Sequence, residues 1–506
     1  MKPRLNLGAW RQLNGAEGGH ALWLPAEHLV THGVVVGMTG SGKTGLLTVM
    51  IEEAARAQVP TVVIDIKGDL PNLLLAFPGF EPAPLEPWVE LESDQQREGP
   101  SPELLAARAQ ELCDQRRAAL AEWQLGEPEL AAYCAGTAVR VLTPGGSAGE
   151  PLHMLSSLER RSPRWDSDPE AARNALTAAV SLVLRLLGRE PDPAKSREHV
   201  LLSVLAERRL LAGQTAELGA LMQDVLEPPI TQIGALSVNA FMKKNERKNL
   251  AAALNSLLAA PSFASWRQGT TLDVGEWLTP SPEQPGKTPI VVVSVAHLDD
   301  EERALVLGVL LEEVLSWVRT LPGSQRLRAL LVFDEVYGFL PPHPANPPSK
   351  RPLVALMKQA RAFGVGVVVA TQNPMDLDYR ALSNAGLWFI GRLQTDADRA
   401  RVIDGLAGAL GAADEDLGST FTRLAPRWFV VRNAHAASPP ILVQPRYAMS
   451  LLRGPMTRLE IRAARGVKDT VTAPVIAEPA KPSQPWAAAS AVTPRRGRFA
   501  QRRQDA

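Results

Sequence analysis

Apolar residues gather in short runs along the chain, and each such run predicts a buried strand. These runs occupy 34–36, 61–66, 139–142, 290–295, 329–333, 365–370 and 387–390. Between them, apolar residues recur at helical spacing over 43–57, 102–135, 168–188, 196–227, 246–259, 299–320, 351–362 and 395–406. Because buried strands alternating with helices form parallel sheets, we expect an α/β fold with helices on both faces of the sheet.

The strand and helix patterns are not evenly spread. Ala- and Leu-rich helical spacing dominates the middle of the chain, and two runs near the end, 428–432 and 441–444, predict a closing hairpin or edge. The end of the chain is rich in Ala, Pro, Ser and Arg, a composition that buries too little apolar surface to fold. The expected parts are an N-terminal segment 1–31, a core in two pieces 32–85 and 286–465, a helical insertion 86–285, and a disordered basic tail 466–506.

The first apolar run leads directly into a glycine-rich loop. Residues 34–44 read Val-Val-Val-Gly-Met-Thr-Gly-Ser-Gly-Lys-Thr, which completes the phosphate-loop pattern G-x-x-x-x-G-K-[ST]. Its glycines let backbone amides turn toward phosphate oxygens, and the following helix directs its positive end at the same anion. Lys43 would reach the β- and γ-phosphates, and the Thr44 hydroxyl would bind Mg²⁺. The candidate ATP-binding residues are Gly37, Thr39, Gly40, Ser41, Gly42, Lys43, Thr44 and Gly45.

Two carboxylates end another apolar run, Leu330-Leu-Val-Phe-Asp334-Glu335. An Asp at the end of a strand beside the phosphate-loop strand can hold the Mg²⁺ that bridges the phosphates, usually through water. The adjacent Glu335 can orient or deprotonate the attacking water. The alternative to a catalytic role is that the Asp-Glu pair caps a helix, because apolar runs that end in Asp-Glu also occur at helix caps. With a phosphate loop on a separate strand, we expect Asp334 to bind metal and Glu335 to be catalytic.

A polar amide and an arginine complete the candidate chemistry. Gln372 follows the run 365–370 and is placed to hydrogen-bond the γ-phosphate or the water, although it can also be a turn residue before Asn-Pro. Arg361 can supply the guanidinium that phosphoryl transfer requires, or it can simply compensate a helix dipole. Ring ATPases take such an arginine from a neighbouring subunit. Arg392 and Arg399 are rival candidates for this role.

Composition limits the partners. Lys and Arg total 54, and so do Asp and Glu, so no global field attracts nucleic acid. DNA contact would come from a ring pore or from a local patch such as Lys243, Lys244, Arg247 and Lys248, which is otherwise a solvated helix start. The two cysteines form no C-x-x-C pair, and no apolar run approaches 18 residues. We therefore expect a cytoplasmic protein without an integral membrane segment.

The full series of motifs resembles the HerA/FtsK superfamily of hexameric ATPases, which includes HerA-type DNA translocases and ATPases of conjugative secretion. The series is the phosphate loop, Ile-Asp-Ile-Lys-Gly-Asp, Phe-Asp-Glu, Arg-Ala-Phe-Gly, Ala-Thr-Gln-Asn-Pro and Phe-Ile-Gly-Arg-Leu-Gln-Thr-Asp-Ala-Asp, within 32–80 and 288–445. The resemblance implies a RecA-like core, a six-membered ring with ATP and Mg²⁺ at subunit interfaces, and DNA in the pore. It matches Asp334 and Glu335 to the metal-binding and catalytic acids, Gln372 to the sensor, and Arg361 to the trans-acting arginine.

Two features depart from HerA proteins. Only about 30 residues precede the phosphate loop, where HerA proteins carry a β-barrel that helps to bind a nuclease, and the long insertion resembles the helical additions of conjugative-secretion relatives. The leading hypothesis is a homo-hexameric, ATP-hydrolysing motor, a HerA-like DNA translocase or helicase, with a nuclease or another protein as a further partner. The alternatives are a peripheral ATPase of a conjugative or secretion-type export complex, and a nucleotide-gated scaffold, which the presence of Glu335 and Gln372 disfavours.

Overall fold

The structure is a computed structural model of the 506-residue chain. It describes residues 3–13, 18–91, 101–162, 164–372, 377–382, 385–393, 395–400, 402–403, 420–436 and 439–466. Residues 1–466 form one compact unit, and the boundaries predicted within it at 85 and 285 stay a prediction. Apart from Gly466, the predicted tail lies outside the described residues.

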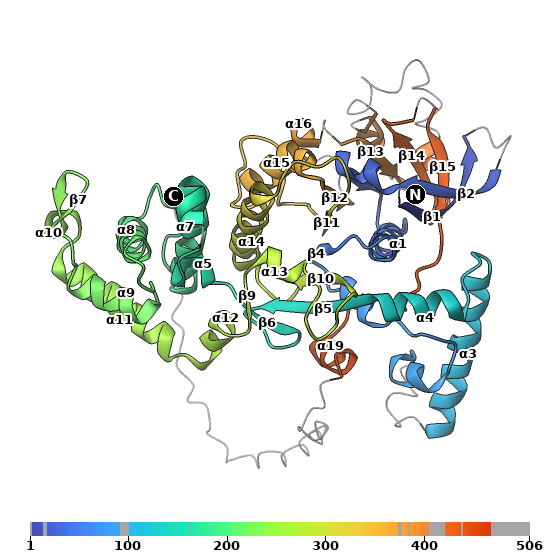
Figure 1. The fold of residues 1–506 in the computed structure, drawn as a ribbon, viewed down its shortest axis with the longest axis horizontal. Coiled ribbons are helices and arrows are strands. Elements are labelled where there is room, and N and C mark those ends of the chain that lie inside the picture. Colours follow the sequence, from blue (N-terminus) through green and yellow to red (C-terminus); the bar gives the residue numbers. More distant parts are fainter. Residues whose placement is uncertain are drawn as a thin grey trace, which may run out of the picture. The chain divides into compact units, whose positions relative to one another are not determined.

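One large sheet forms the centre of this unit (Figure 1). Among the described residues it contains 13 strands in the order β2-β1-β15-β14-β13-β3-β12-β11-β4-β10-β5-β6-β9. The strands are β1 Arg4–Gln12, β2 Gly18–Pro25, β3 Gly33–Val36, β4 Thr61–Asp65, β5 Thr137–Pro144, β6 Glu150–His153, β9 Thr270–Thr271, β10 Thr288–Ser294, β11 Ala329–Asp334, β12 Val365–Thr371, β13 Leu387–Ile390, β14 Phe429–Asn433 and β15 Ile441–Pro445. A separate hairpin joins β7 Gln232–Ile233 to β8 Leu236–Ser237.

The run from β13 to β9 is parallel throughout, and the four strands from β14 to β2 are antiparallel. This arrangement confirms the predicted α/β fold with a mainly parallel sheet. The predicted hairpin is β14–β15, but it is not the edge of the sheet, because β1 pairs with β15 and β2 with β1. Strands β5, β6 and β9 belong to the segment predicted as a helical insertion and continue the sheet beyond β10.

Helices are the other regular elements of the described residues. The α-helices are α1 Lys43–Arg56, α3 Pro102–Ala121, α4 Glu127–Gly136, α5 Ser156–Glu159, α6 Arg164–Ser167, α7 Pro169–Leu186, α8 Arg197–Leu211, α9 Leu218–Leu226, α10 Val238–Phe241, α11 Lys244–Ala259, α12 Ala264–Arg267, α13 Val274–Trp277, α14 Asp300–Thr320, α15 Lys350–Gln359, α16 Tyr379–Leu382 and α19 Arg458–Ala464. Shorter 3₁₀ segments are η1 Ala26–Thr31, η2 Leu70–Leu74, η3 Ala83–Trp88, η4 Pro261–Phe263 and η5 Ala360–Phe363. No helix among the described residues is long and apolar enough to cross a membrane.

Two of the predicted long helices are each two helices. The predicted helix 102–135 divides into α3 and α4 at Gly126-Glu-Pro128, because the glycine favours a break and the proline fits the first turn of a new helix. The predicted helix 196–227 divides into α8 and α9 near Gly213, which has a φ of +71°. The helix predicted over 395–406 is present at 396–400 and 402–403, and residues 401 and 404–406 lie outside the described residues.

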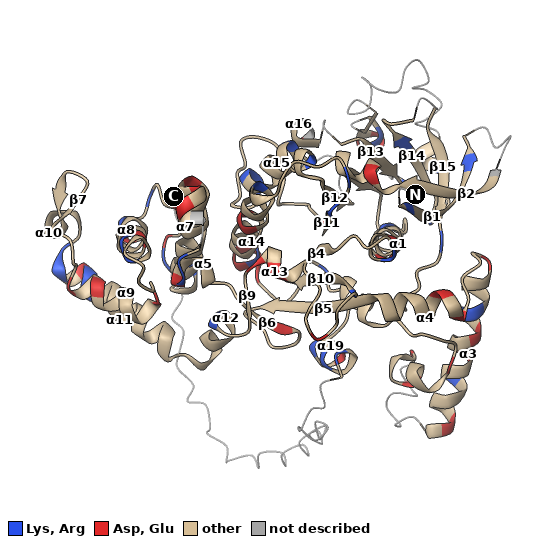
Figure 2. Ribbon diagram, viewed as in Figure 1, with Lys and Arg blue, Asp and Glu red and all other residues tan. Residues whose placement is uncertain are grey.

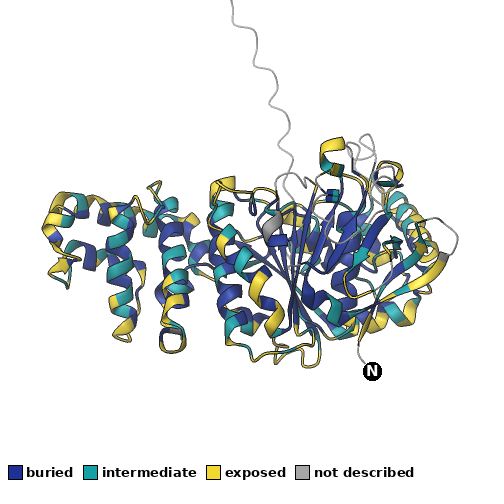
Figure 3. Ribbon diagram, turned by 90° about the horizontal axis from the view of Figure 1, so that it is seen from above, coloured by how far each residue is buried: buried dark blue, intermediate teal, exposed yellow. Residues whose placement is uncertain are grey.

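Alternate residues of the central strands face two separate cores. In β3, Val34 and Val36 lie in the core covered by helices such as α7, α14 and α15. Val35 lies in the opposite core, covered by α1, α3 and α4. Figure 3 shows the buried strands between helices on the two sides. Because both faces are covered, these strands are apolar along most of their length, which is why the sequence identifies them.

The C-terminal ends of the parallel strands meet at one edge of the sheet. Asp334 at the end of β11 is level with Asp65 at the end of β4, and Ser294 of β10 is level with the same Asp65. Thr371 at the end of β12 is level with Val36 of β3, the strand that leads into the phosphate loop. Loops that are far apart in the sequence therefore converge at this edge.

A buried ion-pair network joins the end of β15 to helix α1. The Arg446 guanidinium lies 2.9 Å from a Glu52 carboxylate oxygen and 3.0 Å from one of Glu53, and the arginine and Glu52 side chains are fully buried. Glu52 also accepts hydrogen bonds from the backbone amides of Met449 and Ser450, at 3.0 and 2.8 Å. The network fixes the segment that follows β15 against the helix that begins at the phosphate loop.

We predict that Arg446→Met lowers the free energy of unfolding by about 3–5 kcal/mol, because it leaves the buried Glu52 without a cation, whereas Glu53 keeps its ion pair with Arg56 at 2.6 Å. The matched control is Arg161→Met, which removes the exposed ion pair with Asp166 and is expected to cost about 0–1 kcal/mol. Urea unfolding followed by circular dichroism measures both variants. Equal effects of the two substitutions would contradict a structural role of the buried network.

Candidate nucleotide-binding site

The phosphate loop connects β3 to α1 and depends on glycine conformations. Gly40 and Gly42 have φ values of +77° and +95°, which glycine adopts without strain. A Cβ at Gly42 would also lie 3.0–3.1 Å from Arg427, so a larger residue would be crowded there. α1 begins at Lys43, immediately after these glycines.

Neighbouring segments hold this loop by backbone hydrogen bonds. The Gly37 amide donates to the Thr371 carbonyl at 3.3 Å, and the Met38 amide donates to the Arg392 carbonyl at 2.9 Å. The Arg427 amide donates to the Ser41 carbonyl at 3.0 Å. The loop is thus shaped by strand β12 and by the segments that follow β13 and precede β14.

The loop borders a cavity of about 530 Å³. Its lining residues are Thr39, Gly40, Gly42, Lys43, Thr44, Gly45, Lys67, Asp69 and Gln372. Of the predicted binding residues, only Gly37 and Ser41 are not in this lining, and both make backbone hydrogen bonds that shape the loop. The sequence-predicted residues therefore form one continuous concave surface with the amides of a helix N-terminus, which suits a polyphosphate.

Lys43 lies inside the loop. Its Nζ donates to the carbonyls of Gly37 at 2.5 Å and Met38 at 3.1 Å. Burial, with the positive charge of Lys67, lowers the pKa of Lys43 to about 8, although Glu335 and Asp334 act in the opposite direction. A value near 8 leaves the ammonium group largely charged at neutral pH, as binding of phosphate requires.

Two aspartates lie side by side beneath the loop. Burial raises the pKa of Asp65 to about 6, against hydrogen bonds from Ser294 and the Gly68 amide at 2.8 and 2.9 Å. Burial, together with the charge of Asp65, raises the pKa of Asp334 to about 7. The Asp334 Oδ2 atom is buried without a hydrogen-bond partner among the described residues. A buried carboxylate oxygen with this vacancy fits a divalent cation or a water molecule that the cation binds.

Glu335 is held in a strained position at the same edge. Its φ is +61°, unusual for a residue with a long side chain. One carboxylate oxygen lies 2.7 Å from Lys67 Nζ. The other accepts hydrogen bonds from the Thr371 hydroxyl and from the backbone amide of Gln372, both at 3.3 Å. Burial lowers the pKa of Lys67, but its contact with Glu335 and the charges of Asp334 and Asp69 together outweigh burial, and the net shift is upward. The carboxylate is therefore fixed and ion-paired.

Gln372 reaches the phosphate loop itself. Its side-chain oxygen accepts a hydrogen bond of 2.6 Å from the Thr39 hydroxyl. The structure thus brings Gln372, Glu335 and Asp334, from the ends of two strands, to the loop carried by a third strand.

The candidate arginines are distributed differently. Arg361 lies in η5, before β12 begins, and therefore at the opposite edge of the sheet from the phosphate loop. There it lines a separate cavity of about 1200 Å³, the amino-edge cavity, with Arg326 and Lys358. Arg392 accepts a hydrogen bond from the loop through its carbonyl, and Arg399 is ion-paired with Asp396. Of the predicted site residues, Arg361 is the one not brought to the loop of its own chain.

Sequence reasoning did not assign roles to Asp65, Lys67 or Arg427. Asp65 lies near the end of the apolar run 61–66, and Lys67 follows this run. Polar residues at the end of a buried strand were the available signal, because the ends of parallel strands share one edge. The position of Arg427 against the loop had no such signal.

The basic residues singled out in the insertion do not act as one patch. Arg247 is buried and donates to the carbonyls of Val225 and Leu226, both at 3.3 Å, and to Asn239 at 2.8 Å. It is a structural residue of the α9–α11 packing. Lys243, Lys244 and Lys248 are exposed at the start of α11, beside α10 and β7 (Figure 2).

Comparison with known proteins agrees with this geometry. The family described as "Helicase HerA-like C-terminal" matches residues 12–80, which contain the phosphate loop and β4. No curated protein matches the sequence. The structure of VirB4 of Thermoanaerobacter pseudethanolicus aligns with a TM-score of 0.50 and 12% identity, covering 88% of this chain and 96% of that chain. The bacterial conjugative coupling protein TrwB aligns with a TM-score of 0.41 and 14% identity, covering 86% and 89%.

The matched segment includes the glycine-rich loop and the strand that carries Asp65, and the fold match extends over most of the chain. These findings confirm the resemblance stated from the motifs. Residues 12–80 are thus similar to the HerA-like C-terminal family, and the chain has an α/β fold like that of the VirB4 structure.

Proposed function

We propose that this protein hydrolyses ATP at the phosphate-loop cavity and works as a ring motor, a HerA-like translocase or helicase acting on DNA. The observation that carries the proposal is the placement of Glu335 and Gln372. Both come from strands other than the phosphate-loop strand, and Gln372 contacts the loop directly through Thr39. A protein that only bound nucleotide would not need a fixed carboxylate and an amide at this position.

The side chains divide the chemistry between them. Lys43 and the amides at the start of α1 would bind the phosphates, and the Thr44 hydroxyl and Asp334 would hold Mg²⁺, which would supply positive charge against the phosphates. Glu335 accepts the proton of the attacking water, and Gln372 orients that water or the γ-phosphate. Lys67 lines the same cavity and keeps the Glu335 carboxylate in place.

The position of Arg361 favours a ring of subunits. β12 runs Val365–Thr371, a length of about 20 Å at the usual rise per residue. Arg361 precedes its start, while the phosphate loop lies beside its end, so this arginine cannot reach phosphates bound in its own chain. If it stabilises the transferring phosphoryl group, it does so in a neighbouring copy. We therefore propose a homo-hexamer with ATP at the interfaces and DNA in the pore.

Measurement of ATP hydrolysis with and without nucleic acid tests the proposed substrate. We expect duplex or single-stranded DNA to increase the turnover number severalfold and RNA to have a smaller effect. The purified full chain is assayed with each of the three nucleic acids, at the same concentration of nucleic-acid residues. Equal turnover with and without all three would contradict a DNA motor and favour the alternatives, an export ATPase or a nucleotide-gated scaffold.

The second prediction concerns the base. Glu335→Gln should lower kcat by about 10²–10⁴-fold, because the amide cannot accept the proton. It should leave ATP affinity nearly unchanged, because the phosphate-binding groups remain. The matched control is Glu283→Gln, an exposed glutamate in the loop before β10, which should change neither quantity. Calorimetric titration with ATP and a phosphate-release assay separate the two effects. Loss of affinity together with turnover would show that Glu335 has a structural or metal-binding role instead.

The third prediction concerns assembly. Arg361→Ala and Lys43→Ala subunits should each be inactive alone, but mixing them should restore some activity. Mixed interfaces then contain an intact loop from one subunit and an intact arginine from the other. Because loss of such an arginine costs about 10³–10⁵-fold in rate, a small restored fraction is measurable.

Arg328→Ala serves as the control, since Arg328 is exposed at the same edge of the sheet. This variant should keep its activity. Full activity of the Arg361→Ala protein would contradict the trans role, and the same mixing experiment then applies to Arg392 and Arg399.

A further inference from the structure

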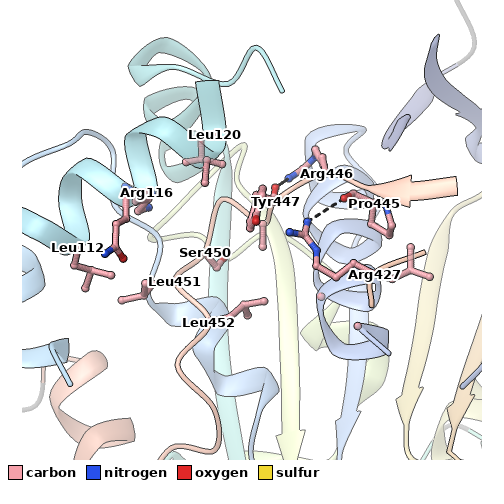
Figure 4. Close-up of a pocket in the computed structure, with 16 residues that line it drawn as sticks. Leu112, Arg116, Leu120, Arg427, Pro445, Arg446, Tyr447, Ser450, Leu451 and Leu452 are labelled. Carbon is pink, nitrogen blue, oxygen red and sulfur yellow. Dashed lines mark hydrogen bonds between the residues drawn. The ribbon is translucent and has the colours of Figure 1, made fainter. Parts of the chain in front are cut away.

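A second cavity, of about 410 Å³, adjoins the phosphate loop (Figure 4). Gly42 and Gly45, at the start of α1, line both this cavity and the phosphate-loop cavity. The two cavities therefore meet along the first turn of α1. A ligand with its phosphates in the loop would have the rest of its structure directed past Gly45 into the second cavity.

The walls of the second cavity suit a flat aromatic group. Leucines of α3 and of the segment after β15 line it, among them Leu112, Leu120 and Leu451. The Tyr447 ring also lines it, with the Arg427 guanidinium 3.7 Å from the ring centroid. Apolar walls with a tyrosine and a guanidinium plane are what stacking of a nucleobase requires.

Buried contacts fix these walls in place. Arg446 ties Tyr447 and its neighbours to α1 through Glu52 and Glu53. Arg116, which is 7% exposed, ties α3 to the same segment by donating to the Met449 carbonyl at 2.8 Å. The guanidinium groups of Arg116 and Arg446 are thus engaged by protein oxygens. The cavity presents apolar surface to a ligand more than charge.

We propose that this cavity binds the nucleoside of the triphosphate and that α3 forms one wall of the nucleoside site. The inference rests on the proposed function, because it requires the phosphates to lie in the loop. α3 lies in the segment predicted as an insertion, outside the two core pieces. The insertion therefore contacts the nucleotide directly, and its first long helix responds to whether a nucleoside is bound.

The test compares ATP with inorganic tripolyphosphate, which has the phosphates without the nucleoside. Binding of each, with Mg²⁺, is measured by calorimetry on the full chain. Tyr447→Ala, which removes the ring, and Leu112→Trp, which fills the cavity, should each weaken ATP binding at least tenfold. Neither should change the affinity for tripolyphosphate by more than about twofold, since the phosphate-binding groups are intact. Ala118→Trp, on an exposed face of α3, is the matched control and should change neither affinity.

The outcomes separate the two proposals. If the wild-type chain binds neither ligand, ATP binding itself fails and the inference fails with it. If ATP binds and both cavity variants bind it as the wild type does, the nucleoside is elsewhere and the inference alone is wrong. Lys43→Ala should weaken both ligands, which locates the phosphates in the loop.

A second measurement tests the role of α3. Hydrogen exchange of the amides in 102–121 should slow with ATP and not with tripolyphosphate, because only the nucleoside would contact this helix. Equal exchange with ATP, with tripolyphosphate and without ligand would overturn the role of α3.

Discussion

Arg446 lies fully buried between Glu52 and Glu53 of α1, and the placement of the nucleotide site depends on this contact. The arginine immediately follows the last strand of the sheet, whereas the two glutamates lie on the helix that begins at the phosphate loop. Glu53 also accepts a hydrogen bond from the Asn6 amide at 2.7 Å, so β1 joins the same network. Segments from both ends of the compact unit are thereby fixed to the helix that would bind phosphate.

Carboxylates and lysines lie close together at the carboxyl edge of the sheet. Asp65 and Asp334 are buried on neighbouring strands. Burial raises the pKa of both carboxyl groups, and the charge of Asp65 raises the pKa of Asp334 further. Lys43 and Lys67 supply the opposing charge, and Lys67 is ion-paired with Glu335. A triphosphate adds negative charge beside the lysines, and a divalent cation adds positive charge beside Asp334. The site therefore suits the two together better than either alone, which is the usual requirement of phosphoryl transfer.

Sequence alone predicted the parts of the fold that are buried on both faces. Strands such as β4, β11 and β12 are continuous apolar runs, and the loop pattern located the phosphate cavity beside them. β1 and β2 were missed because neither is a continuous buried run, and their place in the sheet depends on pairing of β1 with β15, more than 400 residues away. The Lys67–Glu335 pair and the wall formed by α3 were missed for the same reason, since both depend on contacts between distant segments.

The parallel sheet also separates two sets of basic side chains. Lys43 and Lys67 lie at the carboxyl edge, in the cavity that would bind the phosphates of a nucleotide held by the same chain. Arg326, Lys358 and Arg361 line a cavity at the amino edge, a strand's length away. A side chain cannot cross that distance, so the second set is useful to phosphoryl transfer only if another molecule presents its phosphates there. In a closed ring, every copy would place its amino edge beside the carboxyl edge of a neighbouring copy. Each nucleotide site would then be complete without any change in the fold of the subunit.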